Sequence, residues 1–203
     1  VVAIGSSAFA KNTYLQSVVI PDTVTKIDAG AFSECTNLSG VALSEGLVEL
    51  GKYAFGGTAL TNIIIPKSLE TAHTGWEHIG NSTKTDGPFA NCGQLKKVTL
   101  EAGSTQIAQF VFAGCNALEQ VDLPDTLTKI SKGAFIACTN LESVALPDTI
   151  TKIDEGAFTE CTKLKNINLP KSLIELGRYA FGETALTNII IPKSLETAHT
   201  GWE

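Results

Sequence analysis

Apolar residues return along this chain with a period of 23 residues. Residues 20–42, 123–145 and 146–168 align without gaps on L/I-P-x-x-L/I/V-T-x-I-x-x-x-A-F-x-x-C-x-x-L-x-x-V/I-x. Counted from the first residue of this repeat, the apolar positions are 1, 5, 8, 12, 13, 16, 19 and 22. That spacing matches neither the 3.6-residue period of an amphipathic helix nor the alternation of a half-buried strand. It predicts short coils that turn their apolar residues toward a shared axis.

Stacking is what makes such coils stable. One coil is too small to bury a core alone, whereas neighbouring coils together bury a continuous one. About eight coils, stacked at the spacing of paired strands, form a rod or shallow arc roughly 40 Å long. The sequence therefore predicts a repeat solenoid that occupies residues 1–203 as a single domain.

The coils vary in a way that indicates duplication. Residues 43–64 and 169–190 are one residue short and lack the cysteine, and residues 100–122 depart from the LP and AF pairs. The coil at 65–99 carries extra residues, which places an insertion loop at 73–88. A shift of 126 residues maps 1–77 onto 127–203, with TALTNIIIPKSLETAHTGWE identical in both copies. We expect a duplicated block within a fragment of a larger repeat protein.

Composition narrows the function classes. The net charge is -6 with an isoelectric point near 5.1, and the lysines are scattered, so the basic stripe of a nucleic-acid-binding protein is missing. No stretch approaches the roughly 20 apolar residues of a membrane span, so membrane insertion of these residues is not predicted. The N-terminal VVAIGSSAFAKN shows no signal peptide and the chain has no Met, as expected of an excised piece.

The 23-residue pattern, recurring over essentially the whole chain, resembles the BspA-like, treponeme-type class of leucine-rich repeats. The resemblance implies a right-handed superhelix with a parallel β-sheet on its concave face, formed by segments such as 39–43 and 142–146. It also implies that A-F-x-x-C turns the convex side. Proteins of this family are large surface or secreted proteins of host-associated bacteria and some protozoan parasites, linked to adhesion and to host matrix proteins.

Five cysteines share repeat position 16: Cys35, Cys92, Cys115, Cys138 and Cys161. Neighbouring coils would bring their Cα atoms within the range that a disulfide tolerates. The odd count and the parallel, inward orientation favour space-filling instead, since a buried free Cys behaves as a small hydrophobe. No C-x-x-C spacing supports a zinc site.

The insertion contains the other candidates for chemistry. His73, Glu77 and His78 could be read as metal ligands, but their spacing is not H-E-x-x-H and the segment reads as a loop, so no metal site is predicted. Trp76 has two interpretations: it anchors a partner, or it packs the insertion onto the solenoid.

The sequence offers few candidate catalytic residues. There are only three histidines, two of them copies of one position, and no glycine-rich phosphate loop follows a predicted strand. We predict neither an enzyme nor a cofactor.

Solenoids commonly bind on their curved sheet face. The resemblance implies that repeat positions 21 and 23 point out of that face. The face is then small, amide-rich and weakly charged, with exposed aliphatic residues at Val19, Ile64 and Ile190. One interpretation is a protein-binding strip, and the other is a face that is merely solvated. The predicted ligand-binding residues are Asn62, Ile64, Lys97, Thr99, Gln120, Asp122, Asn166 and Asn168 on this face, with Trp76 from the insertion.

The sequence hypothesis is thus a non-enzymatic protein-binding or adhesion module of a cell-surface or secreted protein. Its expected partner is a host matrix or cell-surface protein, with no nucleic acid involved. The alternative is a structural stalk that presents other domains of a larger protein.

Overall fold

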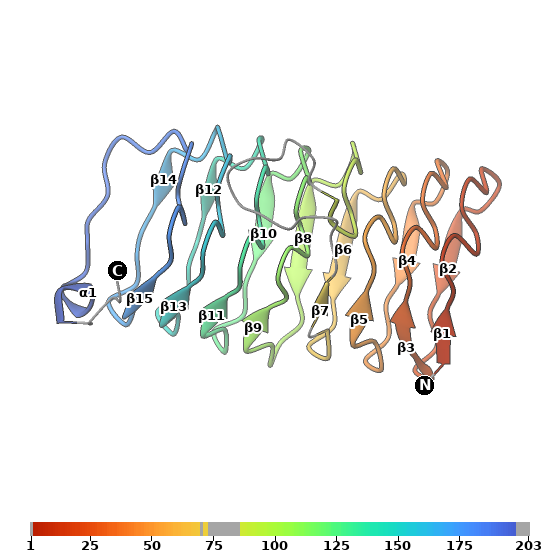
Figure 1. Cartoon of the computed structure of the whole chain (residues 1–203), viewed down its shortest axis with the longest axis horizontal. Helices are drawn as coiled ribbons and strands as arrows, with labels where there is room; N and C mark the ends of the chain where they lie inside the picture. The colour runs from red at the N-terminus through yellow and green to blue at the C-terminus, as the bar shows by residue number, and fades with distance from the viewer. Residues whose placement is uncertain (1, 70, 73–85, 198–203) are drawn as a thin grey trace.

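The coils lie side by side along one axis, from the N-terminal coil at one end of the rod to the C-terminal coil at the other (Figure 1). In this computed structural model, residues 2–69, 71–72 and 86–197 are described. One continuous hydrophobic core runs from Ile20 to Ala180. The predicted repeat solenoid with a spacing of about 23 residues and parallel sheets is confirmed.

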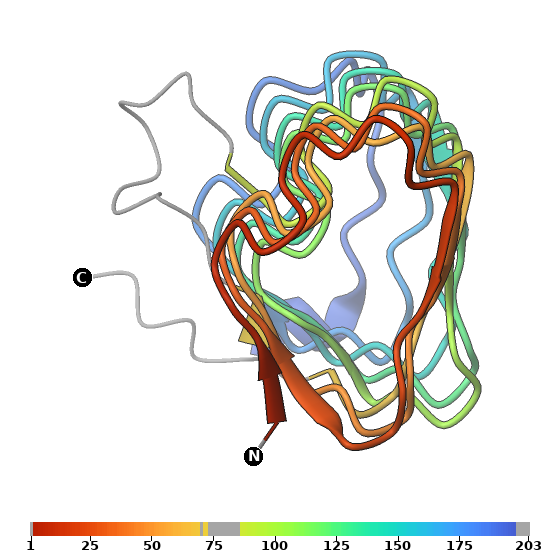
Figure 2. The same cartoon turned by 90° about the vertical axis from the view of Figure 1, so that its right-hand side faces the viewer.

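Most coils contribute one short strand to each of two sides of the rod (Figure 2), and parallel pairing joins the described strands into five sheets of two to four strands. The even-strand face consists of β2 (Ser17–Val19), β4 (Gly40–Ala42), β6 (Asn62–Ile65), β8 (Lys97–Leu100), β10 (Gln120–Asp122), β12 (Ser143–Val144) and β14 (Asn166–Ile167). The odd-strand face consists of β1 (Val2–Ile4), β3 (Val24–Ile27), β5 (Glu49–Leu50), β7 (Thr71–Ala72), β9 (Gln106–Ile107), β11 (Lys129–Ile130), β13 (Lys152–Ile153) and β15 (Glu175–Leu176).

The even-strand face is the predicted sheet, since β4 and β12 lie within the segments 39–43 and 142–146. The odd-strand ladder was not predicted. It forms because repeat position 8 is a fully buried isoleucine, as in Ile27, Ile130 and Ile153, while position 7 beside it stays partly exposed. This short alternation is enough for strands that are paired on both sides.

A short helix, α1 (Lys193–Thr197), lies near the end of the described chain. Within the described residues, no helix has the length and apolar character needed to cross a membrane.

The A-F-x-x-C segment forms a third side of every coil and doubles back on itself. Repeat position 15 has a positive φ in each coil, from Lys11 (62°) through Ala137 (57°) to Glu183 (54°). Position 11 adopts the same left-handed conformation in most coils. The N–H groups at positions 11, 13 and 15 donate to carbonyls of the next coil, as Phe135 N does to Ala157 O at 2.8 Å. Backbone hydrogen bonds therefore join the coils on this side as well.

A column of phenylalanine rings at repeat position 13 fills the centre of the stack. The column runs through Phe9, Phe32, Phe55, Phe89, Phe112, Phe135, Phe158 and Phe181. Most ring centroids are 5.1–5.5 Å apart with nearly parallel planes, and the gap widens to 6.4 Å between Phe89 and Phe112. The six rings from Phe32 to Phe158 are fully buried, so this Phe column contributes a large share of the apolar area removed from water.

We expect Phe135→Ala to destabilise the protein strongly, because truncating a buried ring costs about 3–5 kcal/mol of unfolding free energy. Phe9→Ala is the matched control, since Phe9 caps the column and is 45% exposed, and its loss should be clearly smaller. Urea unfolding followed by circular dichroism measures both. Equal losses for the two variants would contradict a core built on the column.

Candidate functional site

The even-strand face alternates between buried and exposed residues. In β6 the pattern is exposed, buried, exposed, buried from Asn62 to Ile65, and in β10 Val121 is buried between Gln120 and Asp122. Repeat position 22 therefore faces the core while positions 21 and 23 face outward, as β-geometry requires. Whether those outward residues bind a ligand stays a prediction.

Three paired strands bring six of the predicted binding residues together. In the register of β6, β8 and β10, Asn62 lies opposite Lys97 and Lys97 opposite Gln120. The second row consists of Ile64, Thr99 and Asp122. Asn166 and the position of Asn168 lie further along the rod, where β14 pairs with β12.

Lys97, Gln120 and Asp122 form a polar cluster within this sheet. The Lys97 ammonium lies 2.7 Å from Asp122 Oδ2, and Gln120 Nε2 donates to Asp122 Oδ1 at 2.8 Å. The hydrogen bond from Lys97, followed by that from Gln120, lowers the pKa of the Asp122 carboxyl. The positive charge of Lys97 is thus paired with the negative charge of Asp122 at the centre of the even-strand face.

Aliphatic side chains stand exposed on the N-terminal part of the same face. Val19 is 77% exposed and Ile64 is 62% exposed, with the exposed Ala42 on the strand between them. We call Val19, Ala42 and Ile64 the aliphatic strip. Single exposed aliphatic residues are common, but three on successive strands form a small apolar patch next to the polar cluster.

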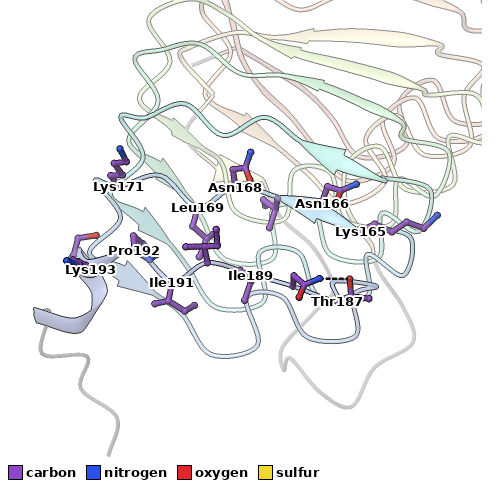
Figure 3. Close-up of a pocket in the computed structure, with 14 residues that line it drawn as sticks. Lys165, Asn166, Asn168, Leu169, Lys171, Thr187, Ile189, Ile191, Pro192 and Lys193 are labelled. Atoms are coloured by element: carbon purple, nitrogen blue, oxygen red, sulfur yellow. Dashed lines mark hydrogen bonds between the residues drawn. The ribbon is translucent and has the colours of Figure 1, made fainter.

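The C-terminal part of the face opens into a pocket of about 720 Å³ (Figure 3). Asn166 and Asn168 line one side and the segment from Thr187 to Ser194 lines the other, with Ile189 and Ile191 between lysines at the two ends. Ile190, at repeat position 23, is 87% exposed. Amide groups that can both donate and accept hydrogen bonds meet apolar surface here.

The odd-strand face differs because its charged groups pair along the rod. Lys152 lies 2.6 Å from Glu175 Oε1 and 3.2 Å from Asp154 Oδ1, and Lys26 bridges Asp28 and Glu49 in the same way. Lys26 donates a hydrogen bond to Glu49 and Lys152 donates one to Glu175, and these bonds raise the pKa values of the two lysines. These partly exposed pairs neutralise one another on this face.

All five cysteines are buried as free thiols, which confirms the core interpretation. Their sulfur atoms also have a polar role: each Sγ donates to the carbonyl oxygen of the Phe in the preceding coil, as Cys138 does to Phe112 O at 3.3 Å. Burial raises the pKa of Cys161 to about 12 and those of Cys115 and Cys138 well above the ordinary value. The thiols stay protonated and are poor nucleophiles.

The two coils that lack the cysteine keep a hydrogen-bond donor in its place. In both coils a threonine occupies repeat position 16, and its hydroxyl donates a hydrogen bond to the Phe carbonyl of its own coil. Thr58 Oγ1 donates to Phe55 O at 2.8 Å, and Thr184 Oγ1 donates to Phe181 O at 2.9 Å. The sequence already indicates this replacement, because threonine, like cysteine, is a small side chain with a hydrogen-bond donor.

The predicted insertion lies mostly outside the described residues. His73, Trp76, Glu77 and His78 fall there, so their predicted roles remain untested. At its far end Gly87 and Pro88 already belong to the coil, since their carbonyls accept from Tyr53 N and Phe55 N. Tyr53 donates its hydroxyl to Asp86 Oδ1 at 2.5 Å. Among the described residues, no group of three or more His, Cys, Asp or Glu side chains could hold a metal ion.

Comparison with known proteins decides the family. The model of the BspA type leucine-rich repeat region matches residues 2–76 and 83–201. This chain belongs to the BspA-type leucine-rich-repeat family. No curated protein matches it.

Solved leucine-rich repeat proteins share its fold. One from Bacteroides ovatus is 32% identical with a TM-score of 0.67, and the match covers 96% of this chain and 53% of that one. One from Eubacterium ventriosum is 26% identical with a TM-score of 0.67, covering 92% and 47% respectively. One from T. pallidum is 29% identical with a TM-score of 0.61, covering 82% and 72%. This BspA-type chain thus spans about half the length of the first two.

The polar cluster gives a direct electrostatic test. Folding favours the Asp122 carboxylate, so its contribution to stability is present above the unfolded pKa of about 4 and is lost as the pH falls through the lowered pKa. We expect Lys97→Met to raise the pKa of Asp122 toward the ordinary value of 3.8, and Gln120→Ala to raise it less. Carboxyl NMR titration measures both. An unchanged Asp122 pKa in Lys97→Met would refute the pairing.

Proposed function

We propose that this chain is a non-enzymatic protein-binding module of a cell-surface or secreted protein. Its even-strand face contacts a macromolecule of a host or a neighbouring cell, centred on Asn62, Ile64, Lys97, Thr99, Gln120 and Asp122, with Asn166 and Asn168 extending the contact. Membership of the BspA-type family supports surface or secreted localisation, and leucine-rich repeats commonly bind proteins.

The observation that carries the proposal is the aliphatic strip beside the polar cluster. A protein interface needs a desolvated apolar centre surrounded by polar groups that fix orientation. Ile64 on β6 lies directly beside Thr99 on β8, so an apolar centre and a polar rim are adjacent in one sheet. On the odd-strand face, lysines and carboxylates form a series of ion pairs along the rod.

A structural stalk is the second candidate. It is favoured by the unbroken Phe column and by backbone bonds between coils on three sides, which together make a stiff rod. A stalk needs no partner for its even-strand face, so binding separates the two functions.

Binding of the purified chain to immobilised host matrix proteins and to intact epithelial cells tests the proposal. We expect saturable binding that Ile64→Lys weakens at least about tenfold, since losing an interface anchor costs roughly 2 kcal/mol. Ile174→Lys is the matched control, because Ile174 is 53% exposed but lies beside β15, away from the even-strand face. It should leave binding unchanged.

Three outcomes would contradict the proposal. Equal loss in both variants would indicate nonspecific adsorption of the apolar surface. Unchanged binding in Ile64→Lys would move the contact to another face. Absence of binding by a folded chain would favour the stalk.

A further inference from the structure

On the third side of the rod the backbone of each coil dips inward (Figure 2). Repeat position 15 in every coil and position 11 in most coils have a positive φ on this side of the rod. In the N-terminal coils this dip contains a cavity of about 490 Å³. We call it the turn groove; its main lining residues are Ser7, Gly30, Ser33, Glu34, Lys52, Tyr53, Gly56, Gly57 and Asn91.

The same groove is filled with side chains further along the rod. Phe110 and Ile136, at positions 11 and 14, are buried there in a small cluster with Ala113. A Cβ on Gly133 would lie 2.2 Å from the Phe110 ring, so that ring lies over the glycine. In the turn groove the equivalent residues are Ser7, Ser33, Ala10 and Gly30. This side of the coil can therefore accommodate a six-membered ring over a glycine, and next to Gly30 the position of Phe110 is taken by the smaller Ser7.

The lining chemistry of the turn groove is polar and balanced. The hydroxyls of Ser7 and Ser33 lie 3.4 and 3.3 Å from the place of a Gly30 Cβ, and neither makes a hydrogen bond within the described chain. Glu34 has only a 3.7 Å ion pair with Lys11, both highly exposed, and Lys52 has no acidic partner among the described residues. One carboxylate and one ammonium on the walls give no net charge, which disfavours a strongly anionic or cationic ligand.

Tyr53 provides a fixed aromatic wall. Its hydroxyl is held by Asp86, and its ring lies close enough to Gly56 that a Cβ there would meet Tyr53 Cδ1 at 2.7 Å. Strand addition by a peptide is disfavoured, because backbone groups along the groove are already paired. Gly30 N donates to Lys52 O and Gly57 N to Ala90 O, at 2.9 and 3.1 Å. Recognition must therefore use side-chain hydroxyl, carboxylate, ammonium and amide groups.

We propose that the turn groove is a binding site for an uncharged hexopyranose ring of a glycan. Such a ring has C–H faces that pack on Tyr53 and on the glycine floor. Its hydroxyls, each a donor and an acceptor, match Ser7, Ser33, Glu34 and Lys52. This site lies on a different side of the coil from the even-strand face and is independent of the protein-binding proposal.

The test titrates the chain with maltotriose and with triacetylchitotriose while recording ¹H–¹⁵N NMR spectra. At least one trisaccharide should shift the amide signals of Gly30, Gly56 and Gly57 in a saturable way. The decisive variant is Ser7→Phe with Ser33→Ile, which copies the filled section of the groove. The backbone already suits it, since Ser7 and Phe110 have φ of 57° and 56°. We expect this variant to weaken binding at least tenfold.

Controls separate the groove from other causes. Ile64→Lys should bind the trisaccharide as the wild type does, because it alters only the even-strand face. If the double variant does not fold, Tyr53→Ala replaces it; alanine is tolerated in this conformation at Ala137, with φ of 57°. No shift of the groove glycines with either trisaccharide would overturn the proposal. Wild-type affinity in a folded groove variant would overturn it equally.

Discussion

The stacking of one phenylalanine per coil is the constraint on which the rest of this structure depends. Eight rings at repeat position 13 lie one above another, and their spacing of 5.1–5.5 Å over most of the column is close to the spacing of paired strands. The Phe column therefore matches the stacking of the parallel strands and of the hydrogen-bonded turns on the other sides of the coils. Where the spacing widens to 6.4 Å, the coil that bears Phe89 is also the one that carries the insertion.

The polar groups at repeat position 16 also depend on the Phe column, because they lie beside its backbone carbonyls. Each Phe carbonyl in a dry core needs a donor, and a thiol or a threonine hydroxyl at position 16 supplies one in most coils. A thiol is small enough to pack as a hydrophobe and still donates a weak hydrogen bond. All five cysteines are accordingly buried as free thiols.

Much of this architecture could be predicted from the sequence, because buried positions repeat every 23 residues. Ile27, Phe32, Cys35 and Leu38 were all predicted to face the core, and all are fully buried. The odd strands could not be predicted because most of them are only two residues long. The turn groove could not be predicted because it depends on backbone conformation and on the side chains at variable positions. Ser7 and Phe110, for example, share one φ but leave the groove open or fill it.

Identical segments also show what sequence alone cannot specify. TNIIIP occurs twice, but Asn62–Ile65 forms strand β6 against β8, whereas residues 188–191 form no strand. In the first copy β6 pairs with β8 of the following coil, and residues 188–191 have no such strand partner among the described residues. Prediction of a binding surface from sequence is limited in the same way. The repeat pattern predicts which residues face outward, but the residues of neighbouring coils determine whether charges on a face are paired, whether its surface is apolar and whether it contains a cavity.

The five thiols, one in each of five coils, allow the most direct test of a shared core. Labelling with a thiol reagent at low urea, resolved by mass spectrometry for each cysteine, reports how often each coil opens. Cys115 and Cys138 should label slowest, at the rate of global unfolding, and Cys35, nearest the exposed end of the Phe column, should label first. Equal and rapid labelling of all five cysteines in the folded protein would contradict a core closed by the Phe column.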